Sequence, residues 1–599
     1  MLLYDSRKLE YKAPFGAVKT HQGVTINFPV NRSVNVTGVF VIIRKEDLSR
    51  RINLPFSHEK DGYNVFSTTF SLEEAGIHYY RFEIETPTGI IFVGKTDDGK
   101  AIAGDWLPEW QLTVYEDSYA TPEWLKGGII YHAFADRFAR KESPVRPEYG
   151  VFKEWTEELT IRDEDGVYRA NDFYGGNAMG IVEKLPYLHK LGVTAIYLSP
   201  VFESHSNHRY DTADYSKIDP MFGTEQEFET LINTAKEYGI SIILDGVFNH
   251  TGADSIYFNK FNRYDNLGAY QSKESPYHSW FTFTDFPDEY ACWWGITVVP
   301  TVRRDAVGFH DLITAENGII DKWTKKGVRG WRLDVVDELS TEFVRKIRKA
   351  CKRNGDITVI GEVWEDASTK ESYGEKRSYF LGKELDGVMN YPYKEAIIEL
   401  MTGGNVRDFI NKIYEIAENY PKCSLDSSMT LLGTHDTVRI MNALSGARTP
   451  ESKIDRLHYR LNREEYNRGK SRLKIASLLQ YFLPGVPTVY YGDEIGMQGY
   501  EDPINRRAYP TNGGDSEILT HYQKLGAIRS AHREDFMDGM NLYVENELLV
   551  IERGDVKALI NLTQKTQILD ALVYCEYAKA SVNLISPMSF AIVNKNTNI

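Results

Sequence analysis

Hydrophobic and polar residues alternate in short runs over the first 118 positions of the chain. These runs are rich in β-branched and aromatic residues, and turn-forming residues separate them; they read GVTINF (23–28), VTGVFVII (36–43), YNVFSTTF (63–70) and HYYRFEIET (78–86). A period of two places alternate side chains of a strand in a core, and several such strands in succession are typical of a sandwich. We therefore predict an N-terminal β-sandwich over 1–118, with 117–127 as the linker that follows it.

From residue 129 the pattern changes to apolar strand-like runs that alternate with amphipathic helical stretches. Eight runs are predicted as strands: 129–138, 193–202, 240–250, 328–336, 357–364, 387–391, 428–436 and 487–494. Helical periodicity marks stretches between them, among which are 179–192, 224–239, 311–326, 341–353 and 471–482. Strands that alternate with helices predict a parallel sheet of the α/β class, and eight of them predict a closed (β/α)8 TIM barrel.

Two other stretches depart from this alternation. The segment 251–309 follows the third predicted strand, is rich in Phe, Tyr and Pro, and has no regular period. We predict that it is a small inserted domain at the mouth of the barrel, so that the barrel domain as a whole spans 127–534. From 535 onward the strand pattern returns in NLYVENELLVIERG and KALINLT, which predicts a C-terminal β-sandwich over 535–599.

Composition and charge limit the kinds of molecule that the protein is expected to bind. Hydrophobic residues make up 42% of the chain and charged residues 26%, as in ordinary globular proteins. The net charge of −15 argues against nucleic acid and against an anionic membrane surface as partners. The first residues lack the pattern of a signal peptide, and no apolar run is long enough for a membrane helix. The four cysteines are scattered and form neither a disulfide framework nor a zinc motif, so a cytoplasmic location is expected.

Polar residues with catalytic potential stand at the carboxyl ends of several predicted strands. They are Asp245, Asn249 and His250 after strand three, Arg332 and Asp334 on strand four, Glu362 on strand five, His435 and Asp436 after strand seven, and His208 and Tyr210 in the loop after strand two. A single such residue usually caps a helix or satisfies a loop. In a barrel, however, the carboxyl ends of all strands meet at one rim, where active sites lie.

The stretch GWRLDVVDE (330–338) gives this rim a specific chemistry. Arg332 and Asp334 are two positions apart, so both side chains project from the same face of the strand. Taken alone, the pair could be a structural ion pair. Together with Glu362 and Asp436, it predicts three converging carboxyls that raise one another's pKa values. Such a group, without a metal motif, matches cleavage of a glycosidic bond by a nucleophile and an acid/base, with Arg332 keeping Asp334 ionised.

The same segments resemble a known family. DGVFNH, GWRLDVVDE, GEVW and LLGTHD resemble, in order, the four short signature regions of the α-amylase superfamily of retaining glycoside hydrolases, and the resemblance covers about 127–535. It implies that Asp334 is the nucleophile, that Glu362 is the acid/base, and that Asp436 stabilises the transition state. The residues then expected to bind substrate or support the site are Tyr210, His208, Asn249, His250, Arg332, His435, Asp245, Trp364 and Glu338.

The N-terminal β-domain, CWWG (292–295) and Glu338 resemble the neopullulanase, cyclomaltodextrinase and maltogenic amylase subgroup. This resemblance implies a carbohydrate-binding-like N-terminal domain and a homodimer in which that domain reaches a neighbour's active site; the alternative is a monomer. Two positions depart from the subgroup. VPTVR (299–303) stands where a MPKLN-like motif is expected, and the stretch after DRF (136–138) supplies few oxygen ligands for calcium. No cofactor is expected to be required.

The expected activity is hydrolysis of α-1,4-glucosidic bonds in maltodextrins, cyclodextrins or pullulan. One alternative is a transglycosylase or an α-1,6-active relative on the same barrel, because another sugar could intercept a covalent intermediate. Another is a non-catalytic carbohydrate-binding homologue, which the presence of all three carboxylates disfavours. The sequence does not choose among cyclodextrin, pullulan and linear maltodextrin.

Overall fold

The computed structural model describes residues 3–141, 145–162 and 169–596. The chain forms two compact units. The first unit comprises Met1–Thr121, Glu365–Asp386 and Asn405–Leu425. The second comprises Pro122–Trp364, Gly387–Gly404 and Asp426–Ile599.

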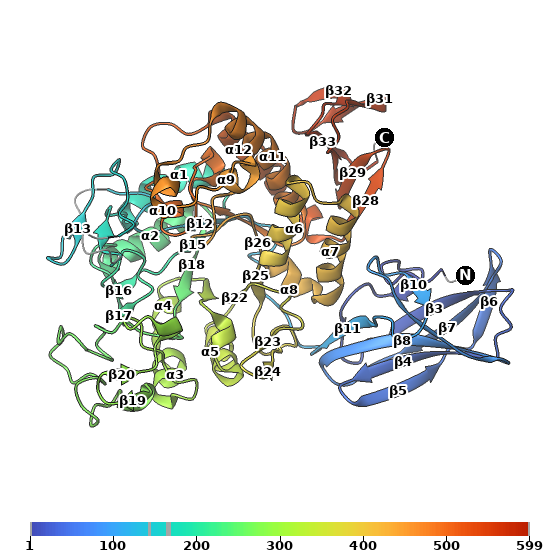
Figure 1. Cartoon of the computed structure of the whole chain (residues 1–599), viewed down its shortest axis with the longest axis horizontal. Helices are drawn as coiled ribbons and strands as arrows, with labels where there is room; N and C mark the ends of the chain where they lie inside the picture. Colours follow the sequence, from blue (N-terminus) through green and yellow to red (C-terminus); the bar gives the residue numbers. More distant parts are fainter. Residues whose placement is uncertain (1–2, 142–144, 163–168, 597–599) are drawn as a thin grey trace. The chain divides into compact units, whose positions relative to one another are not determined.

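Two β-sheets form most of the first unit (blue in Figure 1). A four-stranded sheet has the order β1-β3-β7-β6, from β1 (Lys12–Ala13), β3 (Val24–Asn31), β6 (Phe56–Lys60) and β7 (Tyr63–Phe70). A seven-stranded sheet contains β2 (Val18–Lys19), β4 (Gly38–Lys45), β5 (Leu48–Asn53), β8 (Gly76–Thr86), β9 (Gly89–Lys95), β10 (Ala101–Ala103) and β11 (Trp110–Tyr115). This arrangement is the predicted N-terminal sandwich.

The core of the sandwich follows from the period of two. Along β8 buried and less buried residues alternate almost without exception, so that Tyr80, Phe82 and Ile84 point into the core. Trp110 of β11 stacks on Tyr80 with a ring separation of 5.3 Å. The helix α7 (Val406–Asn419) belongs to the same compact unit although it comes almost 300 residues later in the chain. Its Asn419 backbone oxygen accepts a hydrogen bond from Thr113 of β11 at 2.7 Å.

Eight parallel strands close into a barrel in the second unit (Figure 1), as the sequence predicted. In order around the barrel they are β12 (Ile130–Ala133), β15 (Ala195–Leu198), β18 (Ser241–Gly246), β21 (Gly330–Leu333), β22 (Thr358–Val363), β25 (Gly387–Asn390), β26 (Met429–Leu431) and β27 (Val486–Tyr490). All residues of these strands except Ser241 are buried, which is why their sequences read as continuous apolar runs.

Most of the helices that connect or follow these strands begin at a residue whose side chain caps the helix. They include α1 (Ala178–Lys190), α2 (Glu225–Glu237), α5 (Thr341–Arg353), α6 (Tyr391–Met401), α9 (Ile440–Ser445), α10 (Lys453–His458), α11 (Arg463–Phe482) and α12 (Ser516–Ala531), of which α9 has no side-chain cap. Thr224 and Glu227 form a capping box at the start of α2, and Ser340 caps α5. A short helix α8 (Lys422–Ser427) precedes β26.

Two helix predictions need correction. The single helix predicted over 311–326 is two helices, α3 (Val307–Thr314) and α4 (Ile319–Lys325). The chain breaks between them because Asn317 has a left-handed φ of 62° and Gly318 packs within 2.7 Å of the Leu312 carbonyl, measured from where a Cβ would stand. The helix predicted to begin at 471 is α11, which begins eight residues earlier after a capping box of Asn462 and Glu465.

The segment between β18 and α3 is irregular, as predicted for the insertion. It contains one short hairpin, β19 (Phe283–Asp285) and β20 (Glu289–Tyr290), and two single-turn 3-10 helices, His278–Trp280 and Trp293–Gly295. Aromatic residues give it a core of its own, in which Phe258 contacts Phe281 and Tyr290 at ring separations of 4.9 Å and 4.7 Å. The part 299–302 lies beside the end of β18, where Val302 donates a backbone hydrogen bond to Asn249.

The C-terminal strands form two small sheets (red in Figure 1). One has the order β28-β29-β30-β33, from β28 (Met540–Glu545), β29 (Leu548–Arg553), β30 (Val556–Asn561) and β33 (Ser589–Asn594); the other pairs β31 (Gln567–Cys575) with β32 (Ala580–Ile585). Buried Arg553 joins this part to the barrel, since it donates to the Phe482 carbonyl at the end of α11 at 2.8 Å. The domain boundaries at 118, 127, 534 and 535 stay predictions.

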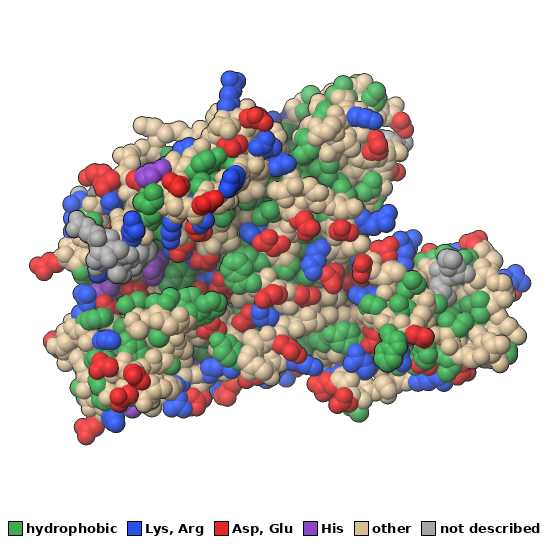
Figure 2. Space-filling view, in the orientation of Figure 1, with side chains coloured by type: hydrophobic (Ala, Val, Ile, Leu, Met, Phe, Trp, Pro, Cys, Tyr) green, Lys and Arg blue, Asp and Glu red, His purple; other side chains and the backbone are tan. Residues whose placement is uncertain are grey.

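The described surface is polar and mixed in charge. Acidic and basic side chains are interspersed over the face shown in Figure 2. No helix in the described part of the chain has both the length and the apolar character needed to cross a bilayer.

Candidate active site

Arg332 of β21 is the centre of a buried charge cluster. Its Nη1 lies 2.8 Å from Asp245 Oδ1 and 2.6 Å from Asp334 Oδ1, and its Nη2 lies 2.9 Å from Glu362 Oε2. Asp245 is the last residue but one of β18 and Glu362 the last but one of β22, the two strands that flank β21. The parallel register therefore brings one carboxyl from each neighbouring strand onto the same guanidinium. Arg332 and Asp245 are fully buried, so neither charge is screened by solvent.

The sequence predicted a simpler arrangement, in which Arg332 serves Asp334 alone. The structure shares the guanidinium among three carboxyls, and its planar fork makes this possible because it presents several N–H groups in fixed directions. Asp334 Oδ1 is engaged by Arg332, whereas Asp334 Oδ2 has no hydrogen-bond partner among the residues that the structure describes. One oxygen of Asp334 thus remains free to react.

Glu362 is held by two N–H groups in addition to Arg332. The backbone N–H of Val335 donates to Glu362 Oε2 at 2.9 Å, and the indole N–H of Trp364 donates to Oε1 at 3.2 Å. Val335 has a left-handed φ of 37°, which is unusual for a β-branched residue and turns its N–H toward Glu362. Trp364 stacks on Tyr391 with a ring separation of 4.0 Å, so its position is fixed as well.

Asp436 follows β26 and has different partners. Arg506 Nη2 lies 3.2 Å from Asp436 Oδ1, and His435 Nε2 lies 3.1 Å from Oδ2. Arg506 is itself held by Asp502 at 2.8 Å and by the His435 carbonyl at 2.9 Å. Asp436 is the most exposed of the three predicted catalytic carboxyls, with a third of its side chain accessible. It therefore faces the opening of the site.

Aromatic hydroxyls and imidazoles connect Asp245 with this opening. Tyr197 and Tyr210 donate to Asp245 Oδ2 at 2.6 Å and 2.9 Å. Tyr210 also lies 2.6 Å from His435 Nε2 and stacks on that ring at 5.2 Å. These contacts satisfy the buried carboxylate of Asp245 and hold its charge next to Arg332.

A second group of residues gathers around Glu338, on the 3-10 turn Val336–Glu338 after β21. Glu338 Oε2 accepts from Asn249 at 2.8 Å, and Oε1 accepts the indole N–H groups of Trp293 and Trp294 at 3.2 Å each. Trp293 packs beside His250 at a ring separation of 5.6 Å. Trp294 is 82% exposed and has a left-handed φ of 52°. Glu338 therefore fixes two indoles at the edge of the site.

Burial and like charges both raise the pKa values of the carboxyls. The sequence predicted the effect of like charges, but burial has the larger effect. Burial is the main cause for Asp334, Glu362, Asp436 and Asp245, and the Arg332 charge opposes it in each case. Mutual repulsion adds to burial, because Glu362 raises the pKa of Asp334 and Asp436 raises that of Glu362. The cluster therefore retains a proton near neutral pH more readily than separate carboxyls would.

The histidines of the site are neutral near pH 7. Burial lowers the pKa of His208 to about 3 and that of His250 to about 4, and it lowers the pKa of His435 well below the ordinary value. Proton exchange above pH 5 is thus left to the carboxyls. His250 Nε2 lies 3.1 Å from the Tyr210 carbonyl. His208 contacts Ser206 at 3.0 Å and accepts from the Tyr210 backbone.

The structure therefore brings together most of the predicted site residues in two connected groups. Five residues of the site were not predicted from the sequence: Arg506, Tyr197, Tyr391, Trp293 and Trp294. The i,i+4 spacing of Asp502 and Arg506 was visible, but such pairs are common on surfaces. The indoles were noted only within CWWG, because nothing in a sequence shows that two N–H groups point at one carboxylate.

No group of three or more His, Cys, Asp or Glu side chains in the described residues is arranged to hold a metal ion. The stretch after Phe138 was predicted to supply few oxygen ligands for calcium. Residues 142–144 of that stretch lie outside the described residues.

Comparison with protein families gives one match. The model described as "Alpha amylase, catalytic domain" matches residues 132–296 and 311–541, which together make up well over half of the chain. The match includes all three predicted catalytic carboxyls and leaves out the N-terminal sheets.

Similar proteins are found among curated sequences and solved structures. The chain is 32% identical over 610 residues to an amylopullulanase of Thermoanaerobacterium saccharolyticum, covering 92% of this chain and 46% of that protein. It is 31% identical over 469 residues to neopullulanase 2 of Thermoactinomyces vulgaris, covering 76% and 71%. The type III pullulan hydrolase from Thermococcus kodakarensis has the same fold, with a TM-score of 0.68, 23% identity and coverage of 99% and 100%. The chain spans less than half the length of the amylopullulanases that it matches.

Proposed function

Because the chain belongs to the α-amylase family, we propose that it is a retaining α-glucan hydrolase that cleaves α-1,4-glucosidic bonds through a covalent glycosyl-enzyme intermediate. The observation that carries this proposal is the shared contact of Arg332 with Asp334 and Glu362 at 2.6 Å and 2.9 Å. One guanidinium bridges the two carboxyls and keeps them close together. Retaining enzymes need such proximity, whereas inverting enzymes separate the two groups to admit a water.

Asp334 is proposed as the nucleophile. Its Oδ1 is bound to Arg332, and its free Oδ2 donates an electron pair to the anomeric carbon as the bond from that carbon to the leaving oxygen breaks. Arg332 favours the ionised form of Asp334 against the effect of burial. Fixed by this contact and by the end of β21, the carboxylate approaches the sugar without reorganisation.

Glu362 is proposed as the acid/base. Burial raises its pKa, so that it can hold the proton that it gives to the leaving oxygen. Once Asp334 is esterified, its negative charge is gone and Glu362 ionises more easily, because a like charge has been removed. As a carboxylate it then takes a proton from the water that attacks the anomeric carbon, which releases Asp334 and restores the starting state.

Asp436 and the Glu338 group are proposed to bind sugar on either side of the bond that breaks. Asp436 is held by Arg506 and remains partly exposed, so its oxygens can accept hydrogen bonds from sugar hydroxyls. Trp294 offers an exposed ring face that Glu338 holds in place. A fixed aromatic face next to the catalytic carboxyls suits an acceptor sugar as well as a leaving sugar, and this favours the transglycosylase alternative over the non-catalytic one.

The substrates are proposed to be maltodextrins, cyclodextrins or pullulan. Relatives named amylopullulanase, neopullulanase 2 and cyclomaltodextrinase support this range. The test is to incubate the purified protein separately with each of the three glucans and separate the products by chromatography, while NMR records the anomeric form first released. We expect α-anomers, and a rise in longer products when glucose is added as an acceptor if transfer competes with hydrolysis. Release of β-anomers, or no cleavage of any of the three, would contradict the proposal.

The cytoplasmic location, the homodimer, a cofactor-free activity and the carbohydrate-binding character of the N-terminal domain stay predictions. Cell fractionation checks the first, and sedimentation of the full-length chain checks the second. Activity that survives a chelator would support the third, whereas loss that calcium reverses would refute it.

A further inference from the structure

His132 is buried inside the barrel, next to His435 of the candidate active site. It stands on β12 in register with Tyr197 of β15 and Tyr490 of β27. Its ring packs against those two rings at centroid separations of 4.4 Å and 5.0 Å. The His435 ring lies 5.2 Å away and nearly at a right angle, with 88° between the two planes. The barrel register therefore brings a second imidazole against the one that contacts Asp436.

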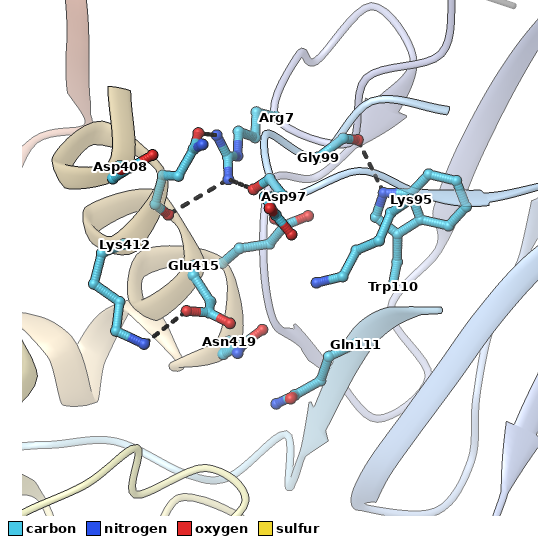
Figure 3. Close-up of a pocket in the computed structure, with 12 residues that line it drawn as sticks. Arg7, Lys95, Asp97, Gly99, Trp110, Gln111, Asp408, Lys412, Glu415 and Asn419 are labelled. Atoms are coloured by element: carbon cyan, nitrogen blue, oxygen red, sulfur yellow. Dashed lines mark hydrogen bonds and ion pairs between the residues drawn. The ribbon is translucent and has the colours of Figure 1, made fainter. Parts of the chain in front are cut away.

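Both ring nitrogens of His132 are buried and have no hydrogen-bond partner among the residues that the structure describes. By contrast, the buried indole N–H of Trp110, in the first compact unit, donates to the Gly99 carbonyl at 2.9 Å (Figure 3). An unpaired buried polar group lowers stability, and a phenylalanine of similar shape would avoid that cost. We therefore expect the imidazole of His132 to use one of its nitrogens.

The contacts of His435 determine where its own proton lies. The Tyr210 hydroxyl donates its hydrogen to Asp245 Oδ2 at 2.9 Å, so its oxygen must accept from His435 Nε2, which is 2.6 Å away. Nε2 also lies 3.1 Å from Asp436 Oδ2. These two acceptors place the proton of a neutral ring on Nε2 and leave Nδ1 with a bare lone pair. Nδ1 is buried and has no hydrogen-bond partner in the described part of the chain.

His132 and His435 thus have complementary unpaired groups. Burial lowers the pKa of His132 well below its ordinary value, and the nearby charges of Arg332 and Arg439 act in the same direction. The ring is therefore neutral near pH 7 and carries one N–H. If that N–H reaches Nδ1 of His435, directly or through one ordered water, it satisfies one buried group on each ring.

A donor at Nδ1 also opposes protonation of His435, because Nδ1 is the nitrogen that would take the second proton. Burial and the positive charge of Arg506 lower the pKa of His435, whereas the Asp436 carboxylate at 3.1 Å favours the cation. The titratable and charged groups that face His435 are Tyr210, Asp436, Arg506, Arg332, His208 and His132.

The charge of His435 matters for the proposed reaction in two ways. A cationic ring would form an ion pair with Asp436 and engage the oxygen that is proposed to accept hydrogen bonds from sugar hydroxyls. It would also repel the positive charge that develops on the sugar ring in the transition state. A neutral ring with its proton on Nε2 avoids both effects.

We propose that His132 is a positioning residue for the reaction. An N–H of its imidazole holds Nδ1 of His435, directly or through one ordered water, and keeps that ring neutral with its proton on Nε2. The inference rests on the proposed function, which places His435 and Asp436 beside the sugar. His132 itself does not touch substrate and acts through His435.

The experiment records long-range 1H–15N correlations of the imidazole rings in the full-length protein labelled with 15N-histidine. The signals of His435 are identified by their loss in His435→Gln. In the wild type we expect a protonated Nε2 and an unprotonated, hydrogen-bonded Nδ1. In His132→Phe, which keeps a ring but has no N–H, the Nδ1 resonance should move toward that of a bare imidazole nitrogen, and the pKa of His435 should rise. His132→Gln keeps an N–H donor and should retain the wild-type resonance.

Kinetics provide a second measurement. His132→Phe should lower kcat on maltotriose about tenfold, as for loss of one hydrogen bond, and His132→Gln should recover most of it. His310→Phe is the matched control, because His310 is a buried histidine of α3 that stacks on Phe343 at 3.9 Å. It should change neither the His435 resonances nor kcat.

Three results would overturn the proposal: a wild-type His435 with its proton on Nδ1, an unmoved Nδ1 resonance in folded His132→Phe, or the same shift in His132→Phe and His132→Gln. The first of these is measured on the wild type, so it decides the matter even if His132→Phe does not fold. If the protein cleaves no glucan, the proposed function fails, but the His435 resonances still report on the contact with His132.

Discussion

Replacing Arg332 by methionine removes the positive charge that three carboxyls share and leaves a side chain of similar length. Its Nη atoms lie 2.6 Å from Asp334 and 2.9 Å from Glu362, which corresponds to charge centres about 4 Å apart. At an effective dielectric constant of about 20, such a pair interacts by about 4 kcal/mol, or about 3 pKa units. Water that enters the vacated space weakens this, so we expect the pKa of Asp334 to rise by at least about one unit.

The assay is the pH dependence of kcat/KM on a short maltodextrin. Its acid limb reports protonation of the nucleophile in the free enzyme. Since Arg332→Met raises the pKa of Asp334, the acid limb should move to higher pH and activity at low pH should be lost first. Arg332→Lys is the control, because it keeps a positive charge but not the fork that reaches all three carboxyls. It should lower kcat while moving the acid limb less.

The stability of Arg332→Met must be measured in parallel, and we expect it to depend on pH. Without Arg332 the buried carboxyls have raised pKa values in the folded state relative to the unfolded state, so stability is lost as pH rises through those values. The unfolding temperature of Arg332→Met should therefore fall further below that of the wild type at pH 8 than at pH 5. A folded Arg332→Met enzyme with an unmoved acid limb would refute the role of this charge.

Further substitutions test the roles of single groups. Asp334→Asn should leave folding nearly intact and lower hydrolysis by about 10³-fold or more, because an amide cannot attack; near-wild-type turnover would exclude it as the nucleophile. Glu362→Gln should retain more activity on an activated aryl α-glucoside than on maltotriose, since only a poor leaving group needs the proton; equal losses would speak against an acid role. Glu338→Ala frees Trp293 and Trp294 and should raise KM for maltotriose about tenfold with little change on an aryl glucoside. Glu338→Gln keeps a hydrogen-bond acceptor, so its KM for maltotriose should lie between those of the wild type and Glu338→Ala. Equal KM values for Glu338→Ala and Glu338→Gln would contradict the role of Glu338 in holding the two indoles.

The barrel was predictable because its strands are buried on both sides and therefore read as apolar runs between capped helices. Helix boundaries were less predictable. The break between α3 and α4 depends on two residues, Asn317 and Gly318, which a helical period passes over. The early start of α11 was encoded by Asn462 and Glu465, but its first turns are polar and show little periodicity.

For the site, the position of residues along the strands predicted which side chains lie at the rim of the barrel. It did not predict which of those side chains contact one another. Arg332 and Asp334 could be placed on one face from their spacing alone. That Asp245 and Glu362 also reach Arg332 depends on the register of three strands, which the sequence does not state. Arg506 comes 70 positions after Asp436, so their contact is a property of the closed barrel rather than of any local pattern.

The left-handed backbone at Val335 has a consequence for attempts to make the protein more heat-resistant. A β-branched residue in this conformation costs on the order of 1–3 kcal/mol, and glycine would adopt it without that penalty. A screen that rewards survival at high temperature would therefore select glycine here. The same replacement loosens the peptide whose N–H holds Glu362, so thermal tolerance and catalytic rate would be traded against each other at one position.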